Sequence, residues 1–255
     1  MSVRDFMQII IFIMALVFLA PPLGQYMTNV FVGRRTFLHP VSGWLERLTY
    51  RLCGIDVSEE MNWRAYTKAL LWFNVFGFGI VFVLQIIQRA FPLNPAGLGN
   101  VQWALAFNTA VSFMTNTNWQ SYAGETTLSY LTQMLGLTVQ NFVSAATGIA
   151  VMLALIRGIV KKTSVSLGNF WIDLTRAVAY VLLPLSIVLA VVLVGQGVVH
   201  SFSPAINATT MEGTIQTIPL GPAASQIAIK QLGTNGGGFF NVNSAHPFEN
   251  PTPFS

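Results

Sequence analysis

The sequence predicts an all-α protein that crosses a membrane several times. Its 255 residues are 53% hydrophobic and only 9% charged, whereas soluble domains carry about 25% charged residues. Four apolar stretches each exceed the ~20 residues that a helix needs to cross a bilayer. They lie at residues 6–32, 66–88, 128–156 and 171–199. Two shorter apolar stretches are each followed by a polar loop.

The first apolar stretch, residues 6–32, is predicted to be a retained membrane helix and not a signal peptide. Its apolar run is too long for the apolar region of a signal peptide. The segment before it carries one basic residue, Arg4, whose charge is offset by Asp5. A kink is expected at Pro21 and Pro22, because proline removes a helical hydrogen bond.

Residues 39–55 follow as a short amphipathic segment. The apolar side chains of Trp44, Leu45, Leu48 and Leu52 recur at helical spacing on one face. The charged residues Glu46, Arg47 and Arg51 are expected nearer the water. This pattern fits a helix on the cytoplasmic membrane surface, and equally fits a connector packed against the other helices.

The two shorter stretches give the chain a repeated layout. Residues 101–114 and 221–232 are too short to cross a bilayer, and each leads into a loop rich in Thr, Asn or Gly. Polar backbone at membrane depth is tolerated only where it is buried or lines a water-filled path. The order span, half-span, polar loop and span is that of a potassium-channel subunit.

Internal repetition of this kind divides the chain into three parts. Residues 1–62 form the N-terminal helix and interfacial segment, 63–162 the first pore repeat, and 163–255 a second repeat without its final helix. Potassium channels surround the ion with four such units. We therefore expect the chain to belong to a longer protein or to associate with further repeats.

The polar loops have the composition of an ion-selectivity filter. Such a filter replaces the hydration oxygens of potassium with rings of oxygen ligands, chiefly backbone carbonyls. The second loop has glycines at 236, 237 and 238, whereas the first has none and must rely on Asn and Thr conformations. Neither loop core contains Asp or Glu, which favours a weakly hydrated monovalent cation.

Polar residues beside the loops are candidates for rim and support. Gln120 follows the first loop, and Asn241 and Asn243 follow the second. Two carboxylates, Glu125 and Glu249, either attract cations to the outer mouth or are solvated loop groups. Gln140 and Asn141 lie mid-membrane and are expected to face the bundle interior; Asn141 either lines the ion path or bonds a neighbouring helix.

Several functions are excluded by what the sequence lacks. It has no Gly-x-x-x-x-Gly-Lys-Ser/Thr loop for nucleotide phosphates, and the cluster at 236–238 is not followed by Lys. It has no Asp-Lys-Thr-Gly phosphorylation sequence and no basic run interleaved with aromatic residues. The chain is therefore expected neither to hydrolyse ATP nor to bind nucleic acid.

Three runs resemble the A-subunit family of the bacterial Kdp-type potassium-transporting ATPases. They are AFNTAVSFMTNTNWQSYAGE at 106–125, GLTVQNF at 136–142 and GTNGGGFFNVNSAHPFENPT at 233–252. The resemblance implies a channel-like, potassium-binding subunit in a bacterial plasma membrane. It implies as partners a P-type ATPase subunit, which supplies the energy, and two smaller membrane subunits. Members of the family have four pore units in roughly twice this length.

The resemblance also implies which residues bind the ion. Potassium coordination falls on Thr115, Asn116, Thr117, Asn118, Thr234, Asn235 and Gly236, and Gln120 sits at the rim. A Trk-type potassium channel or symporter subunit is the nearest alternative, but it generally has one key glycine per filter. A non-transporting membrane scaffold, whose glycine loop is only a packing turn, is an alternative from another class.

The distribution of Lys and Arg predicts that the N-terminus and both polar loops face outside. Ten of these residues fall on one predicted side and three, Arg4, Arg89 and Lys230, on the other. The ten are Arg34, Arg35, Arg47, Arg51, Arg64, Lys68, Arg157, Lys161, Lys162 and Arg176.

Cysteine labelling in intact cells tests this orientation. Cysteines introduced at Asn100 and Asn207 should react with an impermeant thiol reagent added outside, because these loops lie on the side poor in Lys and Arg. Cysteines at Ser42 and Thr163 should stay unlabelled. The reverse pattern would contradict the orientation and place both polar loops on the cytoplasmic side.

Overall fold

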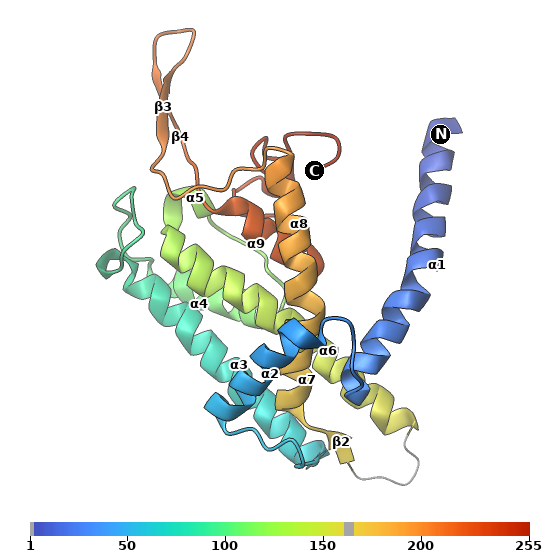
Figure 1. Cartoon of the computed structure of the whole chain (residues 1–255). Coiled ribbons are helices and arrows are strands. Elements are labelled where there is room, and N and C mark those ends of the chain that lie inside the picture. Colours follow the sequence, from blue (N-terminus) through green and yellow to red (C-terminus); the bar gives the residue numbers. More distant parts are fainter. Residues whose placement is uncertain (1–2, 161–165) are drawn as a thin grey trace.

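The computed structural model describes residues 3–160 and 166–255, and it is mainly helical (Figure 1). Within these residues, four helical segments are long and apolar enough to cross a membrane. They are Val3–Val32, Trp63–Ile86, Thr132–Val160 and Phe170–Gly195. The prediction of an all-α protein with several membrane crossings is confirmed. The division into pore repeats at residues 63–162 and 163–255 stays a prediction.

The helices follow in the expected order. They are α1 (Val3–Val32), α2 (His39–Cys53), α3 (Trp63–Ile86), α4 (Trp103–Met114), α5 (Gly124–Thr127), α6 (Val139–Val160), α7 (Phe170–Arg176), α8 (Leu183–Gly195) and α9 (Ala223–Leu232). The π-helical stretches Thr132–Thr138 and Ala177–Leu182 precede α6 and connect α7 to α8. Single 3-10 turns form at Gln88–Ala90 and Asn243–Ala245.

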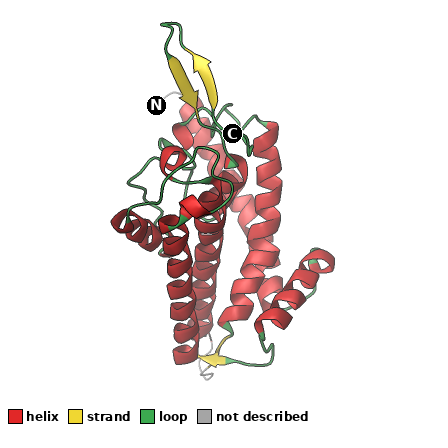
Figure 2. Ribbon diagram, turned by 90° about the vertical axis from the view of Figure 1, so that its left-hand side faces the viewer, coloured by secondary structure: helices red, strands yellow, loops and turns green. Residues whose placement is uncertain are grey.

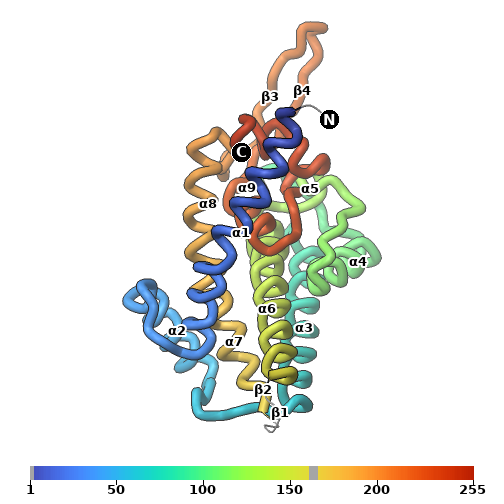
Figure 3. The backbone as a smooth tube through the Cα atoms, turned by 90° about the vertical axis from the view of Figure 1, so that its right-hand side faces the viewer, coloured from blue at the N-terminus to red at the C-terminus, as the bar shows by residue number. Residues whose placement is uncertain are grey.

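Two small antiparallel sheets lie at opposite ends of the bundle (Figures 1 and 3). Strand β1 (Met61–Asn62) pairs with β2 (Ser166–Gly168), near the turn between α6 and α7. Strands β3 (Ile206–Thr209) and β4 (Ile215–Ile218) form a hairpin, not anticipated from the sequence, that projects from the other end (Figure 2). The N-terminus of α1 and the C-terminal loop share the end with this hairpin (Figure 3).

Helix α1 stands beside the bundle for most of its length (Figure 1). It continues through Pro21 and Pro22, so these residues do not end it, and the predicted kink stays a prediction. Only Val30 and Phe31, in its last turn, are buried. The Tyr26 hydroxyl donates a 2.7 Å hydrogen bond to the Tyr180 carbonyl. The C-terminal turns of α1 therefore anchor it, and the rest presents an apolar surface.

Helix α2 is packed against the bundle. The expectation for one of its charged residues, Glu46, was therefore wrong. Glu46 was expected nearer the water, but it is buried and paired with Arg176 at 2.8 Å. Tyr180 and Tyr50 donate hydrogen bonds to the same carboxylate, at 2.6 and 2.8 Å. Burial acts to raise the pKa of Glu46, but these partners outweigh it and hold the pKa below its ordinary value. Trp44 remains exposed.

Helix α6 is the centre of the bundle. It contacts α3, α4, α7 and α9. The side chains that it buries include Ala145, Ala146, Ala150 and Ala154, whose small size lets neighbouring helices approach closely. Phe170 and Tyr66 pack on this alanine surface, with their rings edge to face and their centroids 5.5 Å apart. The two polar loops are therefore held on a tightly packed scaffold.

A largely buried ion pair joins the end of α6 to α7. Arg157 contacts both carboxylate oxygens of Asp173, at 2.5 and 2.9 Å, and donates to the Leu167 carbonyl. The Tyr66 hydroxyl hydrogen-bonds to Asp173 Oδ2 at 3.1 Å and to the Ala150 carbonyl at 2.8 Å. Asp173 is almost fully buried, so its charge depends on these partners.

Replacing Asp173 with Asn should therefore destabilise the fold strongly. The change leaves the Arg157 guanidinium without its charge partner, and breaking a buried pair in this way costs roughly 3–5 kcal/mol. Denaturant unfolding of the full-length subunit in micelles would measure the loss. Glu212→Gln is the matched control, because Glu212 is exposed beyond strand β3. Equal stability of the two variants would contradict the structural role of the pair.

Candidate ion-binding site

The two short helices deliver their polar loops to one place. Helices α4 and α9 both contact α6, and the loops begin where these helices end, after Met114 and after Leu232. Asn235 Nδ2 donates a 2.6 Å hydrogen bond to Asn116 Oδ1. Asn116 Nδ2 donates in turn to the Gly233 carbonyl at 3.3 Å. Residues separated by 119 positions in the sequence thus lie side by side.

The loop amides turn back onto the helix ends. The amides of Thr115 and Thr117 donate to the carbonyls of Val111 and Ser112, both at 3.0 Å. In the second loop, the Asn235 amide donates to the Lys230 carbonyl at 2.8 Å. A helix leaves its last carbonyls without helical partners. The loops supply partners for several of these carbonyls from within the chain.

The loop carbonyls remain free as a consequence. Among the described residues, no hydrogen bond is accepted by the main-chain oxygens of the seven residues predicted to bind potassium. These residues are Thr115, Asn116, Thr117, Asn118, Thr234, Asn235 and Gly236. Asn118 is buried, whereas the other six residues are half-buried or exposed and therefore accessible to a ligand. A stretch of free carbonyls next to satisfied amides is suited to bind a cation.

Left-handed backbone recurs at every second position of both loops. Asn116 and Asn118 each have φ of 59°, Thr234 has 62° and Gly236 has 75°. Alternation of left- and right-handed residues reverses successive peptide planes and brings carbonyls to one side of the chain. Asn tolerates this region and Gly adopts it freely, but for Thr it is a strained conformation. Such strain is typical of ligand-binding sites.

Two buried amide side chains lack partners near the loops. Both the nitrogen and the oxygen of Asn118, and both of Asn141, have no hydrogen-bond partner in the part of the chain that the structure describes. Asn141 is fully buried, as expected for a residue facing the interior. Ser144, one turn along α6, donates a 2.8 Å hydrogen bond to Asn116 Oδ1. Helix α6 therefore presents polar groups towards the first loop.

The predicted rim residues hold the second loop. Gln120 Nε2 donates to the Gly238 carbonyl at 3.2 Å. The Asn241 amide donates to Glu125 Oε2 at 3.0 Å, and Asn243 Oδ1 lies against the Cα of Gly238. Gly237 leaves no room for a Cβ, which would lie 2.7 Å from Glu249 Oε2 and 2.8 Å from the Ser244 amide.

Glu249 has a role that neither sequence-based alternative anticipated. It is not a solvated loop group, because only 2% of it is exposed. Its carboxylate accepts the amides of Gly238 at 3.0 Å and Phe240 at 2.8 Å. Charge-assisted bonds to main-chain amides are strong and fix the loop.

Buried glutamines form a second layer that the sequence analysis missed. Gln226 Nε2 on α9 donates to Gln133 Oε1 at 3.2 Å, and Gln133 Nε2 donates to the Phe239 carbonyl at 3.5 Å. Both glutamines lie within apolar stretches, and a polar residue inside a membrane segment was the available signal. Lys230, fully buried on α9, was counted only among the basic residues on the predicted outer side.

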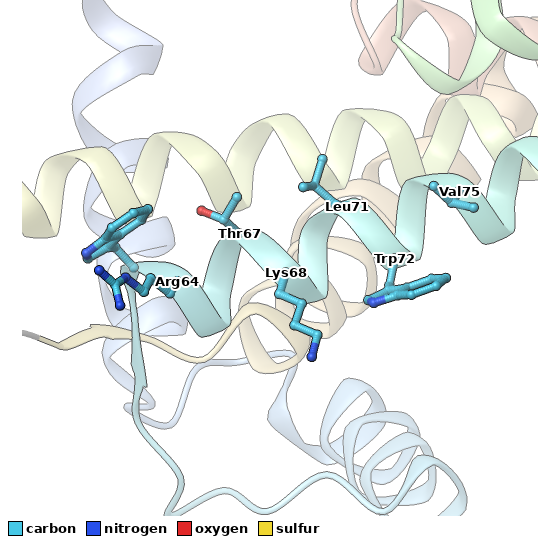
Figure 4. Close-up of a pocket in the computed structure, with 7 residues that line it drawn as sticks. Arg64, Thr67, Lys68, Leu71, Trp72 and Val75 are labelled. Carbon is cyan, nitrogen blue, oxygen red and sulfur yellow. The ribbon is translucent and has the colours of Figure 1, made fainter.

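A groove on the outward face of α3 is separate from this site (Figure 4). It is lined by Trp63, Arg64, Thr67, Lys68, Leu71, Trp72 and Val75. Trp63 and Trp72 are more than half exposed, and Arg64 lies over the Trp63 ring, 5.3 Å from its centroid. Exposed tryptophans beside basic residues are typical of a membrane–water interface.

Comparison with known proteins shows the family of the chain. Residues 10–255 match the family model of the potassium-transporting ATPase A subunit, KdpA. The chain belongs to the KdpA family. Three relatives are each named potassium-transporting ATPase potassium-binding subunit. They come from Pseudomonas entomophila (60% identical over 251 residues), Mesorhizobium japonicum (58% over 255) and Rhodospirillum centenum (60% over 252).

The matches cover nearly all of this chain but less than half of each KdpA relative. The three alignments span 98%, 100% and 99% of the chain, and 44%, 45% and 44% of the respective relatives. The described loops therefore correspond to a part of the KdpA protein.

Glu249→Gln should weaken ion binding in the complete KdpA-containing complex. The neutral amide cannot hold both the Gly238 and Phe240 amides, and hydrogen bonds to charged groups contribute about 1.5–3 kcal/mol each. Loss of one of these hydrogen bonds should raise the potassium concentration that half-maximally stimulates ATP hydrolysis by about tenfold or more. Glu212→Gln, on the exposed hairpin, should leave that concentration unchanged. An unaltered potassium requirement in Glu249→Gln would show that the carboxylate does not set the loop geometry.

Proposed function

We propose that this chain forms the potassium-selecting part of a channel-like subunit in an ATP-driven, high-affinity potassium importer. Potassium enters from outside and is coordinated by main-chain and Thr/Asn oxygens of the two loops. The observation that carries the proposal is the set of free carbonyls at 115–118 and 234–236, beside amides taken up by the helix ends. Rings of carbonyl oxygens are the ligands of potassium filters.

The electrostatic setting supports a monovalent cation. The C-terminal ends of α4 and α9 meet at the loops, and the negative end of a helix dipole stabilises positive charge. No carboxylate lies in the segments 115–118 and 234–236. Glu249, the acidic group behind the second loop, is engaged by two amides. Neutral oxygen ligands remain, and they suit a large, weakly hydrated ion.

Energy supply is assigned to other subunits. Relatives are named as the potassium-binding subunit of an ATPase, and the chain lacks nucleotide and phosphorylation motifs. We therefore place ATP hydrolysis on a partner P-type ATPase subunit, with two smaller membrane subunits completing the complex. The proposed location is the bacterial plasma membrane, with the N-terminus outside.

The structure shows which cysteine positions are suitable for testing this orientation by thiol labelling. Ser42 is buried, so a cysteine there would resist labelling on either side of the membrane. Thr163 lies outside the described residues. The native Cys53, exposed at the end of α2, is a better cytoplasmic reporter. Asn207, exposed in strand β3, is a suitable outside reporter in a Cys53→Ser background.

Gly236→Asp tests the proposed filter. No atom lies within 4 Å of the position that a Cβ would take at Gly236, so its effect comes from the positive φ and the added carboxylate. A left-handed conformation costs most residues with a Cβ about 1–2 kcal/mol and Asp less than that, so the backbone term lowers potassium affinity by less than roughly tenfold. The carboxylate should also reduce potassium/rubidium discrimination.

Two measurements keep this test specific. In the complete complex, the potassium dependence of ATP hydrolysis should shift in Gly236→Asp while the apparent affinity for ATP stays nearly constant. Ala208→Asp, in the hairpin, should change neither. Potassium binding and ion discrimination that are the same in Gly236→Asp as in the natural protein would remove the second loop from the filter. A scaffold would, in addition, show no potassium-dependent thermal stabilisation.

A further inference from the structure

Lys230 is a buried cation beside the second loop. It lies in the last turn of α9, three residues before Gly233, and only 1% of it is exposed. An ionisable side chain at membrane depth is costly to bury, and such residues mark functional positions. In the described structure, no salt bridge within 4 Å joins Lys230 to an acidic group. No ion pair among the described residues neutralises its charge directly, so the charge exerts an electric field on the neighbouring loop.

The ammonium group lies between the two pore units. Nζ is 5.3 Å from the centroid of the Phe113 ring, at the end of α4, which stabilises it by a cation–π interaction. On the other side, Nζ is 3.0 Å from the position of a Cβ built on Gly238. Gln120 Oε1 lies at the same 3.0 Å from that position. The charge is thus fixed against the backbone of the second loop.

Lys230 is also close to the proposed coordinating residues. Its own carbonyl accepts the Asn235 amide at 2.8 Å. Gly236 is two residues from Gly238, and two residues span at most ~7 Å. The ammonium therefore lies within roughly 14 Å of the Gly236 carbonyl oxygen, through a protein interior where salt screens little. Glu249 interacts electrostatically with Lys230, and its carboxylate also accepts hydrogen bonds from two loop amides.

We propose that Lys230 is a charge-selectivity residue that makes the filter reject divalent cations. The proposal rests on the potassium filter proposed above. A fixed positive charge repels a divalent ion with twice the energy with which it repels a monovalent ion. The attraction from the helix dipoles also doubles for a divalent ion, and the positive charge in the last turn of α9 offsets it. Neutral carbonyl ligands alone discriminate by ion size and hydration, which leaves barium, an ion nearly as large as potassium, as a competitor.

Displacement of bound potassium by barium tests the proposal. The complete complex is equilibrated with a potassium tracer without ATP, so that effects of barium on the ATPase subunit do not enter. The barium concentration that displaces half of the tracer is divided by the corresponding concentration of unlabelled potassium. In Lys230→Met, and also in Lys230→Gln, this ratio should fall about tenfold.

Matched variants separate the charge from the shape of the side chain. Lys230→Arg keeps the charge and should keep the ratio of the natural protein. Lys68→Met removes a lysine from the outward face of α3 (Figure 4) and should leave the ratio unchanged. The inference is overturned if the ratio is unchanged in both neutral variants, or if Lys230→Arg lowers it as they do. Loss of potassium binding in both neutral variants would overturn it as well, and would show a purely structural role.

Failure of this inference can be told apart from failure of the filter. If the two loops do not bind potassium, Gly236→Asp leaves potassium displacement unchanged. If the loops bind potassium but Lys230 does not reject divalent ions, Gly236→Asp weakens potassium binding while Lys230→Met leaves the barium-to-potassium ratio of the natural protein.

Discussion

The ends of α4 and α9 impose the constraint on which the rest of the site depends. The sequence predicts that each helix stops within the apolar layer, where no bulk water can satisfy its last carbonyls. The following loop must fold back and donate its amides, as Thr117 does to Ser112 and Asn235 to Lys230. Once the amides are used in this way, the carbonyls of the loops are left without partners. The cation binding that we propose for the loops thus follows from the way in which the helices end.

The scaffold around the loops keeps this arrangement in place. Small side chains on α6 allow close packing, while Ser144 on the same helix holds the Asn116 amide. From the other side, Glu249 and Gln133 hold the main chain between Gly238 and Phe240. The loop conformations include strained left-handed residues such as Thr234. Strain of this kind persists only where surrounding contacts over-determine it.

Charge is distributed differently at the two ends of the molecule. Near the β1–β2 sheet, Arg157 and Asp173 neutralise each other directly, as do Arg176 and Glu46 near α2. Near the loops, Lys230 is held against an aromatic ring instead of a carboxylate. The first arrangement stabilises the fold. The second arrangement leaves the positive electric field of Lys230 beside the proposed ion path, and this field repels a divalent ion more strongly than a monovalent ion.

The sequence by itself determined the membrane class, the four spans, the two short helices and the polar loops that follow them, because apolar length and Thr, Asn and Gly composition are local properties. It also carried the motifs that indicate the KdpA family, and that membership is confirmed. It did not determine the surroundings of Glu46, Glu249 and Lys230: Glu46 was expected nearer the water, a solvated position was one alternative for Glu249, and Lys230 was counted only among the basic residues of one side. Their partners come from distant segments, Glu46 with Arg176 and Lys230 with Phe113. Whether a charge is solvated or buried depends on those long-range contacts, so only the tertiary structure decided it.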